Sequence, residues 1–530
     1  MGGYRVLVSD KLSEQGLDIL RKAEGLAVDV KTGLHAEELK SVIKGYDALV
    51  VRSSTKVTAE IIEAADRLRV IGRAGIGVDN VDVPAATRRG IVVMNTPQGN
   101  AVAAAEHTIA MMCALARNIP QATARLKGGQ WDRGRFMGVE LSGKTLGLVG
   151  VGNIGSIVAQ RAQGLSMKVI AFDPYVTEEV AKARGVELVP LDTLLARSHF
   201  ISVHTPLNDE TRDLVDEKAF ETMRKGVMVI NCARGGIINE RALWDALQSG
   251  KVAGAALDCF EVEPAVGNPL LESDRVICTP HLGASTDEAQ VNVAIAIAEQ
   301  LVNYLNKGIL QNTVNVPSVS PDLLPKLMPF SDLAERLGRF VAQLFHSAIE
   351  TVSIEYTGDV TEFPVAPLRA ASLKGLLHPR LGDIVNFVNA PSMAEERGIT
   401  VTEQSTFKAV DYASLIAIRA SSKEESHSIA GSLFGNKEPR LVELDNCPLG
   451  GILAGYLLLI HNEDRPGVIG NIGTILGKND INIASVKVGR DEKGGAAMTL
   501  LALDGPLPPE MIDEMSEFPH VISVKQLRLP

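Results

Sequence analysis

Three side chains of the sequence are of types that could jointly move a proton and hold an acid. Arg234 follows the apolar run VMVINCA, Glu263 follows AALDCFEV, and His281 follows VICTP. Histidine is a natural acid–base group because its pKa lies near neutrality. Glu263 could fix its tautomer, and Arg234 could hold a carboxylate through two hydrogen bonds. Each residue alone also fits a structural role. The prediction of hydride exchange at a carbon that carries a hydroxyl group therefore rests on all three together.

A glycine pattern upstream predicts a dinucleotide cofactor that could accept a hydride in this reaction. Gly150, Gly152 and Gly155 form GxGxxG directly after the apolar run TLGLV, where a helical segment begins. Such glycines permit a tight turn, a close approach of backbone to a pyrophosphate, and packing of helix on strand. The next apolar run ends in Asp173, about 20 residues on, where a carboxylate binds ribose hydroxyls. Because Asp173 would repel a 2′-phosphate, the pattern predicts NAD rather than NADP.

The elements that must position these residues are short and almost continuously apolar. They lie at 5–10, 48–53, 69–75, 145–150, 168–173, 200–206, 226–235, 252–260 and 275–281. Such runs are typical of parallel strands buried on both faces, with helices between them. Ligands bind at the carboxyl ends of such strands, where the three reactive residues lie. There are too many strands for one sheet, so the sequence predicts two doubly wound α/β domains.

Helical segments at 101–117 and 286–307 could carry the chain from the first domain to the second and back. We therefore expect a substrate-binding domain wrapped around a Rossmann-type NAD domain, then an α+β intervening domain and a ferredoxin-like βαββαβ domain. The predicted bounds are 1–98 with 287–316, 99–286, 317–452 and 455–530. Prolines recur at 315–330, which predicts a linker there.

Bulk properties exclude several classes of protein. With 530 residues, the chain is long enough for three or four domains. A net charge of −11 argues against nucleic acid as a partner. The apolar stretch 101–116 contains Glu106 and His107, which is too broken for a membrane span. Five cysteines without a CxxC pair predict reduced thiols in the cytoplasm, and no residue set suggests a metal.

Six segments resemble signatures of the D-2-hydroxyacid dehydrogenase family over about the first 316 residues. They are GRAGIGVDNVD (72–82), GVGNIG (150–155), HTPLNDET (204–211), NCARGGIINE (231–240), ALDCFEVEP (256–264) and TPHLGAST (279–286). The resemblance implies that His281 is the general acid/base, Glu263 its partner, and Arg234 the residue that orients the substrate. It also implies cofactor contacts at Gly150, Gly152, Asn153, Ile154, Gly155, Asp173, Thr205, Cys232, Ala233 and Asp258.

Within that family, the layout resembles the long-form phosphoglycerate dehydrogenases from end to end. Arg52 and Arg73 end apolar runs and match substrate-binding positions of those enzymes, and Arg133 or Arg135 matches a residue that reaches a neighbouring subunit's site. A solvated surface arginine is the usual alternative for each. The resemblance implies NAD-dependent oxidation of 3-phospho-D-glycerate to 3-phosphooxypyruvate, the first step of the phosphorylated route to L-serine.

Residues 461–486 resemble an ACT domain, a small regulatory module that binds amino acids. Asn462, Asp464 and Asn482 match positions that bind L-serine across a paired interface in enzymes of this kind. The resemblance thus implies serine feedback and a homotetramer. Ordinary turn chemistry is the alternative for Asp-Arg-Pro-Gly.

Three other functions fit parts of the sequence. Another dehydrogenase of the family, such as a hydroxypyruvate or glyoxylate reductase, would share every catalytic residue. A non-catalytic protein that senses NAD could share the fold, since fold does not settle function. The chain could also be mainly a regulatory module. The basic residues, the C-terminal regions and the intact His281, Glu263 and Arg234 favour the phosphorylated substrate.

Overall fold

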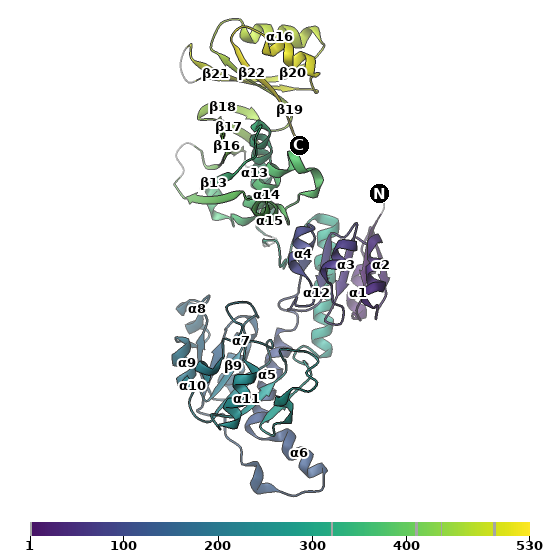
Figure 1. Ribbon diagram of the computed structural model, residues 1–530, viewed down its shortest axis with the longest axis vertical. Helices are drawn as coiled ribbons and strands as arrows, with labels where there is room; N and C mark the ends of the chain where they lie inside the picture. The colour runs from purple at the N-terminus through teal and green to yellow at the C-terminus, as the bar shows by residue number, and fades with distance from the viewer. Residues whose placement is uncertain (1–2, 318, 320–321, 409–411, 436, 491–493) are drawn as a thin grey trace.

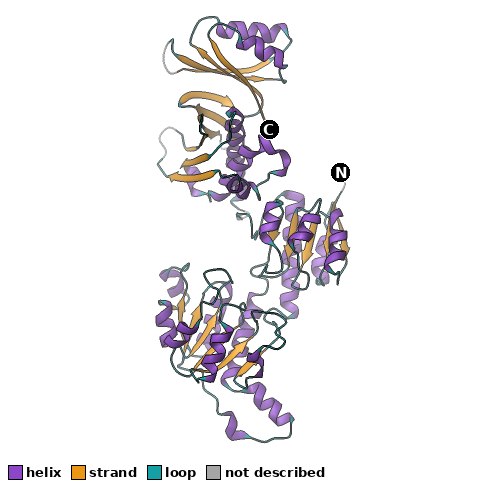
Figure 2. Cartoon of the chain, in the orientation of Figure 1, coloured by secondary structure: helices purple, strands orange, loops and turns teal. Residues whose placement is uncertain are grey.

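The computed structural model describes residues 3–317, 319, 322–408, 412–435, 437–490 and 494–530. Four sheets with their helices follow one another along the long axis of the molecule (Figure 1, Figure 2). We call them the five-, seven-, six- and four-stranded units. The two doubly wound α/β units, the α+β unit and the ferredoxin-like unit are confirmed, while the predicted domain boundaries stay predictions.

The five-stranded unit is a parallel sheet in the order β2-β1-β3-β4-β5. Its strands are β1 (Tyr4–Val8), β2 (Leu26–Val30), β3 (Ala48–Val51), β4 (Val70–Arg73) and β5 (Val92–Met94). Its helices are α1 (Glu14–Lys22), α2 (Ala36–Val42), α3 (Ala59–Ala64), α4 (Val83–Arg88) and α12 (Asp287–Lys307). Helix α12 returns to this unit as expected, because Ala294, Ile297 and Leu301 are buried in the core around β1 and β3.

The seven-stranded unit is a parallel sheet in the order β12-β11-β10-β9-β6-β7-β8, which is doubly wound about β6. Its strands are β6 (Thr145–Val149), β7 (Lys168–Phe172), β8 (Glu187–Leu188), β9 (Phe200–Val203), β10 (Val227–Asn231), β11 (Val252–Leu257) and β12 (Val276–Cys278). Its helices are α5 (Ala101–Ala116), α6 (Ile119–Lys127), α7 (Asn153–Gly164), α8 (Glu178–Ala183), α9 (Leu191–Arg197), α10 (Glu217–Thr222) and α11 (Glu240–Gln248). This order puts the carboxyl ends of β10, β11 and β12 side by side.

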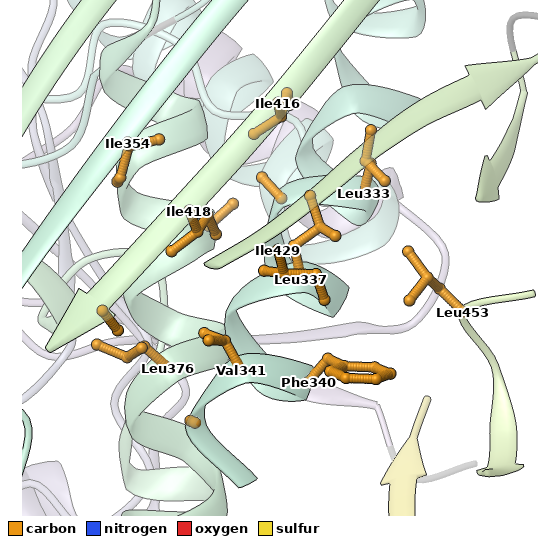
Figure 3. Packing of buried hydrophobic residues seen from close by; sticks show 14 of the residues in the cluster. Leu333, Leu337, Phe340, Val341, Ile354, Leu376, Ile416, Ile418, Ile429 and Leu453 are labelled. Atoms are coloured by element: carbon orange, nitrogen blue, oxygen red, sulfur yellow. The ribbon is translucent and has the colours of Figure 1, made fainter. Parts of the chain in front are cut away.

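The six-stranded unit packs a mixed sheet, β14-β13-β15-β16-β17-β18, on three helices. The strands are β13 (Thr351–Gly358), β14 (Thr400–Thr406), β15 (Ser414–Ser421), β16 (Ser426–Phe434), β17 (Glu438–Leu444) and β18 (Cys447–Ile452). The helices are α13 (Leu324–Leu344), α14 (Ala366–Leu381) and α15 (Ala390–Glu396). Figure 3 shows Leu337 and Val341 of α13 facing Ile418 and Ile429 of the sheet.

The four-stranded unit is an antiparallel sheet in the order β20-β21-β19-β22, which is the predicted ferredoxin-like arrangement. Its elements are β19 (Gly455–Glu463), α16 (Val468–Lys478), β20 (Ile483–Arg490), β21 (Ala496–Leu503), α17 (Pro509–Ser516) and β22 (Val521–Leu529). One face of the sheet is buried under its own helices. Leu457, Leu500 and Leu527 belong instead to the core of the six-stranded unit, so the two C-terminal units share one core.

The predicted linker at 315–330 is wrong in its second half, because α13 begins at Leu324. Pro325 lies in the first turn, where its missing N–H would have no partner within the helix. Pro329 lies inside the helix, yet Leu327 is buried in the core, and this burial stabilises the helical turn that carries both prolines. Residues 318, 320 and 321 of the predicted linker lie outside the described residues.

Within the described residues, no helix combines the length and the apolarity that crossing a membrane requires.

Replacing Leu337 by Ala should destabilise the six-stranded unit, because its side chain is fully buried between helix and sheet. A buried Leu→Ala change typically costs about 2–5 kcal/mol through lost burial and the cavity left behind. Met328→Ala on the same helix is the matched control, since Met328 is 61% exposed. Thermal unfolding followed by circular dichroism should show a lower transition for Leu337→Ala only. Equal transitions for both variants would contradict this packing.

Candidate active site

The turn between β6 and α7 gives the three fingerprint glycines separate tasks. Gly150 has φ +95°, and a side chain there would strike the backbone of His204. A Cβ at Gly155 would overlap the carbonyl oxygen of Gly150, so only glycine lets α7 pack this closely. A Cβ at Gly152 would meet nothing within 4 Å, which leaves open space before the helix N-terminus. The N–H groups at Asn153 and Ile154 can therefore be approached by a diphosphate.

Asp173 and Thr205 lie on either side of this turn, after β7 and β9. The Asp173 carboxylate accepts hydrogen bonds from the backbone N–H groups of Val151 (2.8 Å) and Tyr175 (2.9 Å), which fix its position. The Thr205 hydroxyl is buried, and no described group hydrogen-bonds to it. A buried hydroxyl without a partner suits a bound ligand. The turn, the carboxylate and this hydroxyl together fit the diphosphate and adenosine ribose of NAD.

Of the three remaining predicted cofactor residues, Cys232 and Asp258 are buried. Burial raises the pKa of the Cys232 thiol to about 12, which disfavours the thiolate form. Asp258 is 1% exposed and accepts hydrogen bonds from Thr279 Oγ1 (2.6 Å), Leu282 N (2.7 Å) and Gly283 N (2.8 Å). It therefore holds the turn on which His281 lies. Direct contact of Cys232, Ala233 or Asp258 with the cofactor stays a prediction.

His281 and Glu263 form the pair that the sequence predicts. The Nδ1 atom of His281 lies 3.0 and 2.9 Å from the two carboxylate oxygens of Glu263. The hydrogen bond that His281 donates to Glu263 raises the pKa of His281 above its ordinary 6.5, although burial opposes the shift. Burial also works to raise the pKa of Glu263, but the hydrogen bond with His281 holds it below its ordinary value. The second ring nitrogen of His281 can then exchange a proton with a ligand.

Arg234 follows β10 and spans the two α/β units. Its Nε donates to Asp79 Oδ2 (2.9 Å) of the five-stranded unit, and its Nη1 donates to the carbonyl of Ala233 (2.7 Å). A Cβ at Gly77 would overlap Nη2, so the guanidinium lies directly against that glycine. A carboxylate can bind at this end of the side chain.

Arg52 and Arg73 add positive charge beside Arg234. Burial, followed by the charges of Arg234 and Arg52, lowers the pKa of Arg73 to about 10, while Asp79 opposes this shift. The guanidinium of Arg73 lies against Gly75, where a side chain would overlap it. Arg52 donates through Nη1 to the carbonyl of Lys11 (3.2 Å). The structure thus brings three predicted arginines into one region.

Arg133 and Arg135 do not join this region within one chain. They lie in a short 3-10 helix after α6, and Arg135 pairs with Asp274 of the same unit at 3.5 Å. Figure 1 shows α6 projecting from the seven-stranded unit, away from the five-stranded unit. A role of these two arginines at the site of a second copy stays a prediction.

The three predicted effector residues do not all come together within one chain. Asn462 is buried at the end of β19 that pairs with Ala497. Asp464 accepts hydrogen bonds from Arg490 Nη1 (2.9 Å) and Gly494 N (3.1 Å) just beyond that end. Asn482 donates to Asp504 (2.8 Å) at the opposite end of the sheet. Helix α16 lies between Asn462 and Asp464 at one end of the sheet and Asn482 at the other.

The comparisons with known proteins agree with this geometry. Three family models match: the D-isomer specific 2-hydroxyacid dehydrogenase NAD binding domain at 109–283, the D-3-phosphoglycerate dehydrogenase intervening domain at 326–445, and the ACT domain at 456–520. A curated protein of Archaeoglobus fulgidus, named D-3-phosphoglycerate dehydrogenase, is 46% identical over 99% of this chain and 100% of its own length. A protein of Methanocaldococcus jannaschii with the same name is also 46% identical, over 99% of this chain and 100% of its own length.

The chain belongs to the D-3-phosphoglycerate dehydrogenase family. Among solved structures, it resembles a D-lactate dehydrogenase from Aquifex aeolicus complexed with NAD and lactic acid, at 28% identity and a TM-score of 0.52. That likeness covers 59% of this chain and 100% of the other. The family resemblance, the NAD cofactor and the ACT domain inferred from the sequence are confirmed.

The contacts in the structure identify residues that the sequence analysis missed. Asp79 and Gly77 lie inside the GRAGIGVDNVD segment, which was quoted only as a signature. His107 lies 3.0 Å from Thr279 Oγ1 and 3.2 Å from Asp258, so α5 helps to hold the turn of His281. A histidine beside Glu106 in a largely apolar helix was the available signal for that role.

Cavities among the described residues also lie away from the pair of His281 and Glu263. One of about 970 Å³ is lined by Arg339, Lys374, His378 and Arg528, among other residues, and belongs to the C-terminal units. A smaller one of about 180 Å³ lies beside His461. Neither contains a residue of the His281 site. Among the described residues, no group of three or more His, Cys, Asp or Glu side chains is arranged to hold a metal ion.

The pH dependence of hydroxyacid oxidation should report the pair of His281 and Glu263. His281 must be neutral to accept a proton, and Glu263 raises its pKa above 6.5, so kcat/KM should rise with pH through an inflection above 6.5. Glu263→Gln removes the charge, so the inflection should move to lower pH. Activity should fall at least about tenfold, since acid–base catalysis is worth on the order of 10²- to 10⁴-fold. An unchanged inflection would contradict the pairing.

Proposed function

We propose that the chain oxidises 3-phospho-D-glycerate to 3-phosphooxypyruvate with NAD, as the first step of the phosphorylated route to L-serine. The observation that carries the proposal is the 46% identity, along the whole chain, to proteins named D-3-phosphoglycerate dehydrogenase. The three arginines beside the pair of His281 and Glu263 support it, because a phosphorylated hydroxyacid carries two anionic groups.

Each site residue has one task in this reaction. Arg234 binds the substrate carboxylate, and Arg52 and Arg73 bind the phosphate. Neutral His281 takes the proton of the C2 hydroxyl, and Glu263 stabilises the imidazolium that forms. When bound, NAD supplies the acceptor for the hydride that leaves C2. Approach of the two units would exclude water from the reacting atoms.

The same site argues against the alternatives in different ways. A hydroxypyruvate or glyoxylate reductase would use the same His281, Glu263 and Arg234, but its unphosphorylated acid leaves two arginines without an anionic partner. A solved glyoxylate reductase is 31% identical with a TM-score of 0.54, but it matches only 59% of this chain. A protein that only senses NAD has no need of a histidine and a carboxylate at hydrogen-bond distance.

NADH formation should be strong with 3-phosphoglycerate and weak with D-glycerate, lactate or 2-hydroxyglutarate. Arg73→Gln should raise KM for 3-phosphoglycerate about 10- to 100-fold, since a hydrogen bond to a charged group is worth about 1.5–3 kcal/mol. KM for NAD should not change. Arg21→Gln is the matched control, because Arg21 pairs with exposed Glu14 on the surface of the same unit.

Two results of that assay would contradict the proposal. Turnover of another hydroxyacid without any response to 3-phosphoglycerate would leave a dehydrogenase with a different substrate. Absence of turnover with every acid would favour the protein that senses NAD.

We also propose a homotetramer that contains a dimer formed through α6 and the segment after it. Large apolar side chains are exposed there, including Trp131 at 79% and Met137 at 86%. Exposed apolar patches of this kind mark protein interfaces. A second copy would cover them, and Arg133 and Arg135 could then reach the neighbouring site.

L-Serine is the effector that we propose for the ACT domain. Helix α16 has 11 residues and is about 16 Å long, which separates Asn462 and Asp464 from Asn482. If two copies paired with their α16 helices antiparallel, Asn462 and Asp464 of one copy would lie beside Asn482 of the other. Asp464 could then receive an ammonium group, and the amides could bind a carboxylate. The effector site is therefore shared between subunits.

The cytoplasm is the location that we propose. Cys113, Cys232, Cys259 and Cys278 carry free thiols in the structure. Free thiols are typical of a reducing compartment.

L-Serine should inhibit oxidation of 3-phosphoglycerate, and Asn482→Ala should weaken that inhibition. Loss of the amide removes hydrogen bonds worth about 1 kcal/mol each, so the half-inhibitory concentration should rise several-fold or more. The measurement is the initial rate over a range of serine concentrations for the wild type and the variant. Identical inhibition curves would exclude Asn482 from the effector site.

A further inference from the structure

We propose that Asp79 is a positioning residue that orients Arg234 for the substrate carboxylate from the opposite unit. The proposal rests on the function proposed above and adds a residue to that site. The contact that motivates it joins Arg234 Nε to Asp79 Oδ2 at 2.9 Å, between residues 155 positions apart in the sequence. Among the ion pairs of the described residues, it alone links the five-stranded unit to the seven-stranded unit.

The loop that carries Asp79 is fixed to its own sheet. The side-chain amide of Asn80 donates to the carbonyls of Arg52 and Thr55, both at 2.6 Å. The amide of Asn95 donates to the carbonyl of Ile76 at 2.6 Å. Asp79 can therefore shift only together with the five-stranded unit, so its contact with Arg234 depends on how closely the two units approach.

The contact also determines which end of the guanidinium remains available. An arginine has five N–H donors in a planar fork. Nε donates to Asp79, and Nη1 donates to the carbonyl of Ala233. Nη2 lies against Gly77, where no side chain competes for the space. A guanidinium group that is hydrogen-bonded at both Nε and Nη1 keeps one orientation. Its Nη2 atom is then left for the carboxylate of the substrate.

The charge of Asp79 also has a second effect on substrate binding, which opposes the benefit of orienting Arg234. Asp79 offsets the mutual repulsion of Arg73 and Arg234 in the absence of substrate. The same negative charge repels an anionic substrate as it enters. Asp79 thus improves the orientation of Arg234 and weakens the attraction for anions. Removing its charge and removing its hydrogen bond should therefore change different kinetic constants.

Asp79→Ala and Asp79→Asn separate the two effects. The alanine removes the acceptor, so kcat for 3-phosphoglycerate should fall about 10- to 100-fold, as misplaced groups near the reaction commonly cause. The asparagine keeps an acceptor without the charge, so it should recover most of kcat. Both variants should show a KM for 3-phosphoglycerate no higher than that of the wild type, and an unchanged KM for NAD. Asp79 is largely exposed, so both variants should fold.

Asp18→Asn is the matched control, because Asp18 forms an exposed pair with Lys22 in the same unit. An unchanged kcat in Asp79→Ala would overturn the proposal. So would a joint rise of KM for NAD and for 3-phosphoglycerate with a lower melting temperature, since that pattern indicates a structural role. If the wild type oxidises a different 2-hydroxyacid, the proposed function fails. The same kcat pattern with that acid would still support the role of Asp79.

Discussion

The gathering of positive charge between two α/β units is the constraint on which the site depends. Arg52 and Arg73 come from the five-stranded unit, and Arg234 comes from the seven-stranded unit. Burial, followed by the charges of Arg234 and Arg52, lowers the pKa of Arg73 to about 10, so the neighbouring cations add to the cost of burying its charge. The doubly wound sheets place all three at carboxyl ends of strands, where ligands bind. An anionic substrate would relieve the repulsion.

Backbone features make this arrangement possible. Gly75 and Gly77 leave space for the guanidinium groups of Arg73 and Arg234. His281 has φ +55°, an uncommon value for a residue other than glycine, and buried Asp258 holds the turn around it by accepting hydrogen bonds from the N–H groups of Leu282 and Gly283. Space left by glycines and the hydrogen bonds accepted by Asp258 thus help to orient the reactive side chains, beside the contacts of His281 with Glu263 and of Arg234 with Asp79.

The sequence predicted most of the fold, and the failures have physical reasons. Strands buried on both faces, such as β6 and β9, have continuous apolar runs and were found. The edge strand β2 was missed because it is partly exposed and Asp29 interrupts its apolar residues. The buried strand β5 was missed although residues 91–94 form a continuous apolar run. The prolines of α13 predicted a linker, although burial of Leu327 stabilises a helix there. The Asp79–Arg234 contact joins distant segments, so local patterns could not reveal it.

The most direct test of the central claim is a calorimetric comparison of 3-phosphoglycerate and D-glycerate binding to the enzyme–NADH complex at low and high salt. The arginine cluster predicts that the phosphorylated acid binds about 100-fold more tightly or better at low salt, since each charge-assisted hydrogen bond contributes about 1.5–3 kcal/mol. Added salt should reduce that difference by screening. Equal affinities for the two acids at low salt would contradict the claim that the site is built for a phosphorylated substrate.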